Sequence, residues 1–236
     1  MLLTLPIREV VRATPRARIV RFDLDGHAFD YAPGQAVVAG EPGSDARRPY
    51  SIAAAPEDAA RTHALELLVG VGTDGADGQS GPPFALNANT RVDIEGPVGT
   101  FTFPAHPIER NFIFVAGGTG IAPLRAMLRH AIVGPSPAHH VGLLYSARTP
   151  EEFAYEKEFR AMADRGALDF RQTVTRPGES PWSGARGRID RELLAPLIHG
   201  PETLCFVCGP PALVHDVPRL LGEIGIARER IRVEEW

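Results

Sequence analysis

Short runs in which apolar and polar residues alternate fill the first half of the chain, and clusters of Gly, Pro, Asp and Asn separate them. This alternation is typical of β-strands with one buried face. The runs that predict strands are 17–24, 35–40, 48–55, 63–71 and 91–96. Because no long helical pattern interrupts them, they predict an antiparallel barrel or sandwich.

The second half alternates continuous apolar runs with longer amphipathic stretches. The apolar runs predict buried strands at 111–118, 139–147, 168–175 and 203–210, and the stretches between and after them predict helices at 122–133, 150–166, 190–198 and 211–225. Pro218 has to kink the last helix or delay its start. Strands that alternate with helices predict right-handed β-α-β units and a parallel sheet. Because the pattern changes at Pro104–Pro107, we predict one domain at 1–106 and a second at 107–236.

The composition is that of an ordinary globular protein. The chain has 236 residues, of which 44% are hydrophobic and 23% charged, and its formal net charge is −4. This charge gives no basic field for nucleic acid, and no apolar run approaches the ~20 residues of a membrane-spanning helix. Pro6 and Arg8 come too early for the core of a signal peptide. We expect a cytoplasmic protein, a monomer, that binds neither nucleic acid nor a membrane.

Arginines gather close to the N-terminus, where Glu9 is the only acid before Asp23. The arginines are Arg8, Arg12, Arg16, Arg18 and Arg21. Two interpretations are open: a docking face for an acidic partner, or the solvated face of a strand. The second is the more common origin of such a pattern.

The chain has two cysteines, Cys205 and Cys208. This number excludes a disulfide framework and a four-cysteine zinc or iron–sulfur site built from this chain alone. Both lie in a run that predicts a buried strand, where residues three apart point to opposite faces of the sheet. We therefore expect no redox dithiol and no metal, and we expect any iron–sulfur cluster to reside on another chain.

Two turns of the second half carry the strongest chemical signal. Gly117–Gly120 lie between a predicted strand and a predicted helix, and Pro123 fits the first turn of that helix. Such a turn directs backbone N–H groups and the positive end of the helix dipole at a bound pyrophosphate. The sequence Cys208-Gly209-Pro210-Pro211 ends a later strand. Because the carboxyl ends of parallel strands form one crevice, both turns are expected to face one ligand.

Together with Arg48-Pro49-Tyr50-Ser51, these turns occur in the order found in the ferredoxin–NADP⁺ reductase superfamily, which the chain resembles over nearly its whole length. The resemblance implies an FAD-binding antiparallel β-barrel at 1–106 and an NAD(P)-binding α/β domain with a parallel sheet at 107–236. It implies hydride transfer from NAD(P)H to FAD, then single-electron transfer to a separate ferredoxin, flavodoxin or oxygenase component. The alternative is an electron-transfer or regulatory flavoprotein subunit without independent turnover.

The resemblance also assigns residues to the flavin. Arg48 would donate charged hydrogen bonds to a flavin phosphate, and Tyr50 would stack on the isoalloxazine. The Ser51 hydroxyl would bond to the reactive N5 edge, and Pro49 completes this flavin-binding motif. Ser80 matches a second phosphate-binding turn of the family, although the Gln before it and the prolines that follow depart from the usual pattern.

On the nucleotide side, the resemblance places Cys208 beside nicotinamide C4. The terminal Trp236 would cover the flavin face and yield to nicotinamide, and Glu234 would assist proton traffic near N5. The candidates for binding the nucleotide at the two turns are Gly117, Gly118, Thr119, Gly120, Cys208, Gly209 and Pro210. The catalytic candidates are Ser51, Cys208, Glu234 and Trp236. A frayed tail, or a Trp that caps the core, is the alternative for the C-terminus.

The choice of nucleotide depends on the residues after the second and third strands of the parallel sheet. An acidic residue after the second strand would favour the ribose of NADH. The chain instead has Arg148 there, and Thr175 and Arg176 after the next strand, where NADPH-using relatives often carry a similar pair. We favour NADPH over NADH, and the resemblance favours FAD over FMN.

Overall fold

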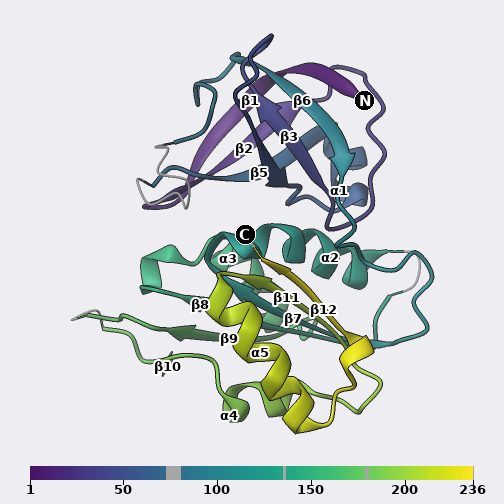
Figure 1. The fold of residues 1–236 in the computed structure, drawn as a ribbon, viewed down its shortest axis with the longest axis vertical. Coiled ribbons are helices and arrows are strands. Elements are labelled where there is room, and N and C mark those ends of the chain that lie inside the picture. Colours follow the sequence, from purple (N-terminus) through teal and green to yellow (C-terminus); the bar gives the residue numbers. More distant parts are fainter. Residues whose placement is uncertain (73–80, 135–136, 179–180, 236) are drawn as a thin grey trace.

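The computed structural model describes residues 1–72, 81–134, 137–178 and 181–235, and it divides into a β-barrel and an α/β domain (Figure 1). The first part contains the strands β1 (Leu2–Thr14), β2 (Ala17–Asp23), β3 (Ala36–Gly40), β4 (Arg47–Ser51), β5 (Ala64–Gly70) and β6 (Arg91–Val98), and the helix α1 (Pro56–Thr62). All neighbouring strands pair antiparallel in the order β4-β3-β6-β1-β2-β5. A bridge between Ile52 and Leu67 joins the two edges, which closes the barrel.

The barrel interior is apolar because alternate residues of the strands point inward. Leu5, Ile7, Val20 and Phe22 belong to this core. β5 differs because both of its faces are buried: one lies in the barrel core, and the other packs against the second domain. The barrel therefore has one strand whose outer face is an interface.

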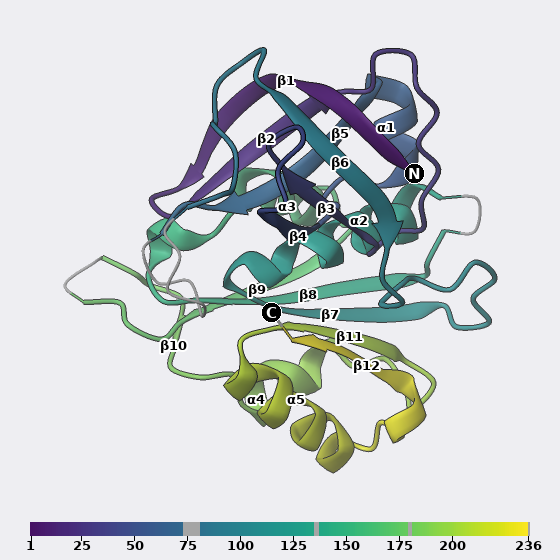
Figure 2. The ribbon, with the colours of Figure 1, turned by 45° about the horizontal axis from the view of Figure 1, so that its top comes forward.

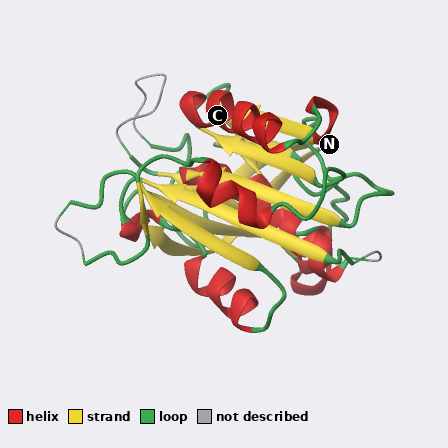
Figure 3. Ribbon diagram, turned by 90° about the horizontal axis from the view of Figure 1, so that it is seen from below, coloured by secondary structure: helices red, strands yellow, loops and turns green. Residues whose placement is uncertain are grey.

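The second part is a parallel sheet with helices on both faces (Figures 2 and 3). Its strands are β7 (Asn111–Gly117), β8 (His140–Ala147), β9 (Asp169–Val174), β10 (Ala185–Arg186), β11 (Leu204–Gly209) and β12 (Ile231–Glu235), in the order β10-β9-β8-β7-β11-β12. Its helices are α2 (Ile121–Val133), α3 (Glu156–Asp164), α4 (Arg191–Leu194) and α5 (Pro211–Ile224). Short 3₁₀ turns occupy Gly118–Gly120, Pro150–Glu152, Ala195–Leu197 and Arg228–Arg230.

The strand order positions the site. From β7 the chain adds β8, β9 and β10 on one side, and it then returns to place β11 and β12 on the other. The carboxyl ends of β7 and β11 are therefore neighbours at the point where the order reverses, which is where open α/β sheets bind ligands. Helix α2 lies between this sheet and the barrel (Figures 1 and 2).

The fold class predicted from the sequence is confirmed, whereas some elements differ. The stretch 150–166 is not one helix: a 3₁₀ turn comes first, Tyr155 adopts φ = 60°, and α3 begins at Glu156. Tyr155 packs against the core there, and this tertiary contact has no sequence signal. Helix α5 begins at Pro211 and includes Pro218, so its start is not delayed.

The N-terminal arginines lie largely on or beside β1 and β2, and several meet acids of the same domain. Arg8 pairs with Asp23, and Arg21 pairs with Glu9 and Glu66. These pairs favour the interpretation of a solvated strand face. Among the described residues, no helix combines the length and the apolar character needed to cross a membrane.

Residues 99–110, all of them described, form the connection between β6 and β7 and contain neither a helix nor a strand. We propose that the boundary between 1–106 and 107–236 falls in this connection.

Candidate functional site at the domain junction

A cleft of about 900 Å³ lies between the barrel and the carboxyl edge of the parallel sheet. Its lining includes candidates from both domains: Arg48, Pro49, Tyr50 and Ser51 of β4, Gly117–Gly120, Arg148, Thr175, Arg176, Cys208 and Pro210. Of the described candidates, Gly209 and Glu234 do not line the cleft. The volume falls in the ~300–1,000 Å³ range of ligand sites. The fold therefore brings sequence motifs that are far apart in the chain to one cleft.

Strand β4 forms the barrel side of this cleft. Successive side chains of a strand point to opposite faces, so Arg48 faces the cleft while Arg47 turns to Asp93 and Glu95. The Arg48 Nη1 atom donates to the carbonyl of Gly81 at 2.5 Å. Tyr50 is half-buried, and its ring packs edge-on against Phe84 with 6.0 Å between centroids. The cleft thus has a cation and an aromatic ring on one strand.

The glycine turn after β7 forms the opposite side. Gly118 has φ = 55°, a backbone conformation that favours glycine. Tyr145, which is fully buried in β8, donates its hydroxyl to the Gly118 carbonyl at 2.9 Å and accepts from the Ala154 N–H at 3.3 Å. The Tyr145 side chain therefore holds the turn in place. No sequence motif marks this residue, and the only signal is that a buried tyrosine hydroxyl needs a partner.

Gly117 and Gly209 let the ends of β7 and β11 meet. A Cβ on Gly117 would lie 2.8 Å from the side chains of Pro210 and Leu213, and a Cβ on Gly209 would lie 3.1 Å from the Gly117 nitrogen. Both distances are shorter than ordinary van der Waals contacts, so a side chain at either position would require its neighbours to shift. The structure thus shows a packing role for Gly209, whereas its part in cofactor binding stays a prediction.

Cys208 contacts Glu234 across the pair β11 and β12. The Cys208 thiol donates to the Glu234 Oε2 at 3.9 Å, and the residue is 1% exposed. Burial raises the pKa of Cys208, and the charge of Glu234 raises it further, so the group is a neutral thiol near pH 7. Burial also raises the pKa of Glu234, which the Cys208 hydrogen bond partly offsets. Cys205 packs on the other face of the sheet, so the two cysteines do not form a dithiol.

Arg148, Thr175 and Arg176 lie together where β8 and β9 end. The Arg176 N–H donates to the Arg148 carbonyl at 2.7 Å, and the Thr175 N–H donates to the Ala147 carbonyl at 2.9 Å. The two arginines therefore occupy neighbouring backbone positions at the lining of the cleft. Arginine side chains that start from neighbouring backbone positions can reach the same phosphate.

Comparison with known proteins decides the family. Residues 4–103 match the family model for an oxidoreductase FAD-binding domain, and residues 114–219 match that for an oxidoreductase NAD-binding domain. The ferredoxin–NADP reductase B of Sorangium cellulosum (strain So ce56) is 34% identical, over 94% of this chain and 93% of that protein. The chain belongs to the ferredoxin–NADP⁺ reductase superfamily. It is an NAD(P)H-dependent flavin oxidoreductase that binds FAD and passes electrons from NAD(P)H through FAD to a partner.

Two longer proteins are similar to this chain over nearly all of its length. The stachydrine N-demethylase reductase subunit Stc4 of Rhizobium meliloti (strain 1021) is 29% identical, over 97% of this chain and 65% of that protein. The crystal structure of the Amycolatopsis reductase GcoB has a TM-score of 0.84 and 26% identity, over 100% of this chain and 69% of that chain. The two-domain fold is thus that of reductases in the superfamily.

Two candidates, Ser80 and Trp236, lie outside the described residues. Gly81, next to Ser80, lines the cleft. On the other side, β12 pairs with β11 in a register that places Glu234 opposite Cys208 and Glu235 opposite Gly209. The C-terminus is therefore not frayed up to Glu235, and the roles given to Ser80 and Trp236 stay predictions.

Some residues that line the cleft were not site candidates from the sequence, and Arg16 was named only as part of the N-terminal arginine cluster. Arg16 pairs with Glu152 at 2.7 Å and so links the barrel to the second domain. Arg188 lies 3.6 Å from Asp216, which is on α5. No motif marks these residues, because only the packing of the two domains brings them to the cleft.

Proposed function

We propose that this chain is a reductase that takes hydride from NADPH and delivers single electrons to a separate small carrier protein, such as a ferredoxin, a flavodoxin or an oxygenase component. The observation that carries the proposal is the shared cleft, which β4 lines from the barrel and the turns after β7 and β11 line from the sheet. A reductase needs this arrangement because nicotinamide and flavin must touch.

The residues present fit both cofactors. Arg48 provides charged donors for a flavin phosphate, Tyr50 provides an aromatic wall, and Ser51 provides a hydroxyl at the same strand end. The turn at Gly118–Gly120 leads into α2, whose N-terminus suits a pyrophosphate. Bound FAD and NAD(P)H supply the redox chemistry, namely hydride transfer and its conversion to single electrons.

The protein's own contribution is to position these groups and to exclude water. Cys208 gives the nicotinamide side of the cleft a small neutral wall, because its raised pKa keeps the thiol protonated. Glu234 holds a proton to higher pH than an exposed carboxyl does, and its Oε2 lies 3.9 Å from the Cys208 Sγ. In this proposal, Cys208 orients the nicotinamide and Glu234 holds a proton near the flavin.

The nucleotide preference rests on Arg148 and Arg176. A backbone hydrogen bond makes Arg148 and Arg176 neighbours, and two arginines at this position suit the 2′-phosphate of NADPH. An acidic residue after β8 would suit the ribose of NADH, but the sequence has Ala147 and Arg148 there. The carrier protein is proposed from the relatives, which include a ferredoxin–NADP reductase and a demethylase reductase subunit. The two cysteines of the sequence are both buried in β11, so a four-cysteine cluster cannot form from them.

The test is turnover with purified, FAD-loaded protein. We expect NADPH to reduce ferricyanide, and then an added ferredoxin or flavodoxin, with a higher kcat/KM than NADH gives. Reduction by NADH alone would contradict the nucleotide preference. A protein that binds FAD but reduces neither ferricyanide nor any carrier would instead be an electron-transfer or regulatory subunit.

A further inference from the structure

The interface between the barrel and α2 contains a buried set of charged groups that the proposed reaction does not use. Glu66 points out of β5 toward α2, and its side chain is 7% exposed. Arg125 of α2 meets it with 2.9 Å between Nη1 and Oε1, and the Arg125 side chain is 10% exposed. The second oxygen of Glu66 accepts from Arg21 at 2.6 Å. A buried ion pair, which water does not solvate, is held in one geometry by its hydrogen-bond partners.

Arg125 has further partners that fix its guanidinium from other directions. Its Nε donates to Glu158 of α3 at 2.9 Å, and its guanidinium lies 4.2 Å from the ring centre of Tyr155. Tyr155 itself adopts the left-handed backbone conformation, with φ = 60°. The planar guanidinium therefore has little freedom to move relative to the barrel.

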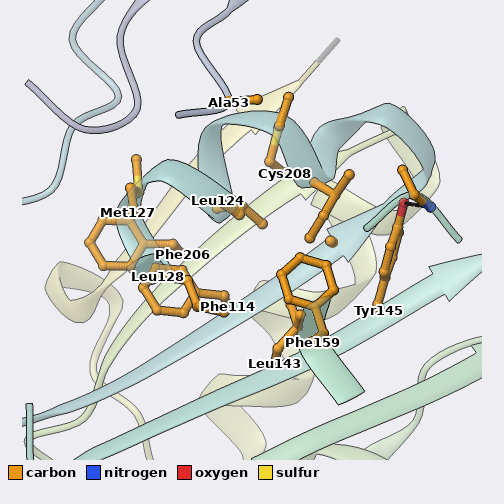
Figure 4. Close-up of a cluster of buried hydrophobic side chains, with 14 of the residues drawn as sticks. Ala53, Phe114, Leu124, Met127, Leu128, Leu143, Tyr145, Phe159, Phe206 and Cys208 are labelled. Carbon is orange, nitrogen blue, oxygen red and sulfur yellow. Dashed lines mark hydrogen bonds between the residues drawn. The ribbon is translucent and has the colours of Figure 1, made fainter. Parts of the chain in front are cut away.

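The contact that links this cluster to the site is with the Ala53 carbonyl. Arg125 Nη1 donates to it at 2.6 Å, and the Ala53 N–H in turn donates to the Glu66 carbonyl at 2.8 Å. Ala53 comes two residues after Ser51, and Arg125 lies in the first turns of the helix that follows Gly118–Gly120. Figure 4 shows Ala53 of the barrel beside α2, among core side chains of the second domain that include Leu124.

We propose that Arg125 is a positioning residue, which sets the separation between strand β4, proposed to bind flavin, and the turn Gly118–Gly120, proposed to bind the nucleotide pyrophosphate. The inference rests on the proposed function. Arg125 is one short backbone segment away from each of the two elements, and it has no place in the lining of the cleft. Its loss should therefore slow hydride transfer without removing a contact to either cofactor.

Arg129, one turn further along α2, supplies a matched control. It bonds to Asp58 of α1 and, at 2.6 Å, to Glu158 of α3, so it also ties the two domains together. Neither Asp58 nor Glu158 adjoins β4 in the sequence. If Arg125 only holds the two domains together, replacing either arginine should have a similar effect on hydride transfer. If Arg125 positions the two elements, only its replacement should slow hydride transfer.

The experiment compares Arg125→Met, Arg125→Lys and Arg129→Met with the wild type. In anaerobic stopped flow at saturating NADPH, we expect Arg125→Met to reduce its flavin roughly tenfold or more slowly, because a displacement of about 1 Å has large effects on reacting groups. The dissociation constants of FAD and of NADP⁺ should stay nearly unchanged. Arg125→Lys keeps the charge but lacks the planar set of donors, so its rate of flavin reduction should lie between those of the wild type and Arg125→Met.

A second readout does not depend on bound cofactor. In the apoprotein, amide hydrogen exchange of segments 51–55 and 118–124 should become faster in Arg125→Met and Arg125→Lys, and not in Arg129→Met. If Arg125→Met does not fold, the rate of flavin reduction and the hydrogen exchange are both measured on Arg125→Lys. Unchanged rate and exchange in the Arg125 variants, or equal slowing in Arg129→Met, would overturn the inference. If NADPH does not reduce the flavin of the wild-type protein, the proposed function is contradicted instead. The hydrogen-exchange data would still test the positioning role of Arg125.

Discussion

Replacing Arg48 by Ala should remove flavin affinity while leaving the barrel folded. Arg48 faces the cleft from β4, and its Nη1 donates a hydrogen bond to the Gly81 carbonyl. Losing that bond should lower the free energy of unfolding by about 0.5–1.5 kcal/mol. Losing the charge-assisted bonds to a flavin phosphate should weaken FAD binding by about 1.5–3 kcal/mol, which is roughly a ten- to hundredfold rise in Kd.

The neighbouring Arg47 provides the control for this prediction. Its guanidinium pairs with Asp93 and Glu95, each at 3.1 Å, on the other side of the strand. Arg47→Ala should therefore lower the free energy of unfolding by about 1–3 kcal/mol, because it leaves the buried Asp93 carboxylate without a cation, and FAD affinity should stay the same. The assay is fluorescence titration of FAD into apoprotein, with urea unfolding of each variant. Equal FAD affinity in Arg48→Ala and the wild type would refute the assignment of Arg48.

Three further changes probe the nucleotide side. Cys208→Ala should fold and keep flavin but slow flavin reduction in stopped flow, because nicotinamide loses part of its wall; an unchanged rate would remove Cys208 from the site. The double change of Arg148 and Arg176 to Ser should raise the KM for NADPH by roughly ten- to hundredfold and spare NADH; equal losses with both would exclude a 2′-phosphate contact. Burial raises the pKa of Glu234 in the folded state above its ordinary value of 4.5, so the stability that its bound proton confers is lost as pH rises through the raised pKa. Glu234→Gln should then be more stable than the wild type in urea unfolding at neutral pH but not below pH 4.5; a pH-independent difference would contradict this.

The sequence predicts the architecture well because the periodic patterns are unambiguous. Buried parallel strands such as β7 and β11 are continuously apolar, whereas barrel strands such as β6 alternate apolar and polar residues, so the two kinds of sheet differ in the sequence itself. The turn at Gly118–Gly120 was also visible in the sequence, because its backbone conformation favours glycine at position 118.

What the sequence did not reveal depends on contacts between the domains. Glu66 looks like an ordinary outward-facing residue of a strand, yet that face of β5 is buried against α2. Arg125 looks like a polar position of an amphipathic helix, and only the docked barrel gives it buried partners. Tyr155, whose ring packs over that arginine, interrupts the expected helical stretch, and α3 begins only at Glu156. Interactions of this kind arise from tertiary packing, which local periodicity does not encode.

A crystal structure of this protein with FAD and NADP⁺ bound would test the proposed site most directly. We expect the isoalloxazine to lie against Tyr50 and Ser51 and the nicotinamide beside Cys208, with the reacting atoms about 3–3.5 Å apart when the ring is in place. We also expect the 2′-phosphate to lie between Arg148 and Arg176. A flavin bound away from β4, or a nucleotide that does not reach the turns after β7 and β11, would refute the proposed site.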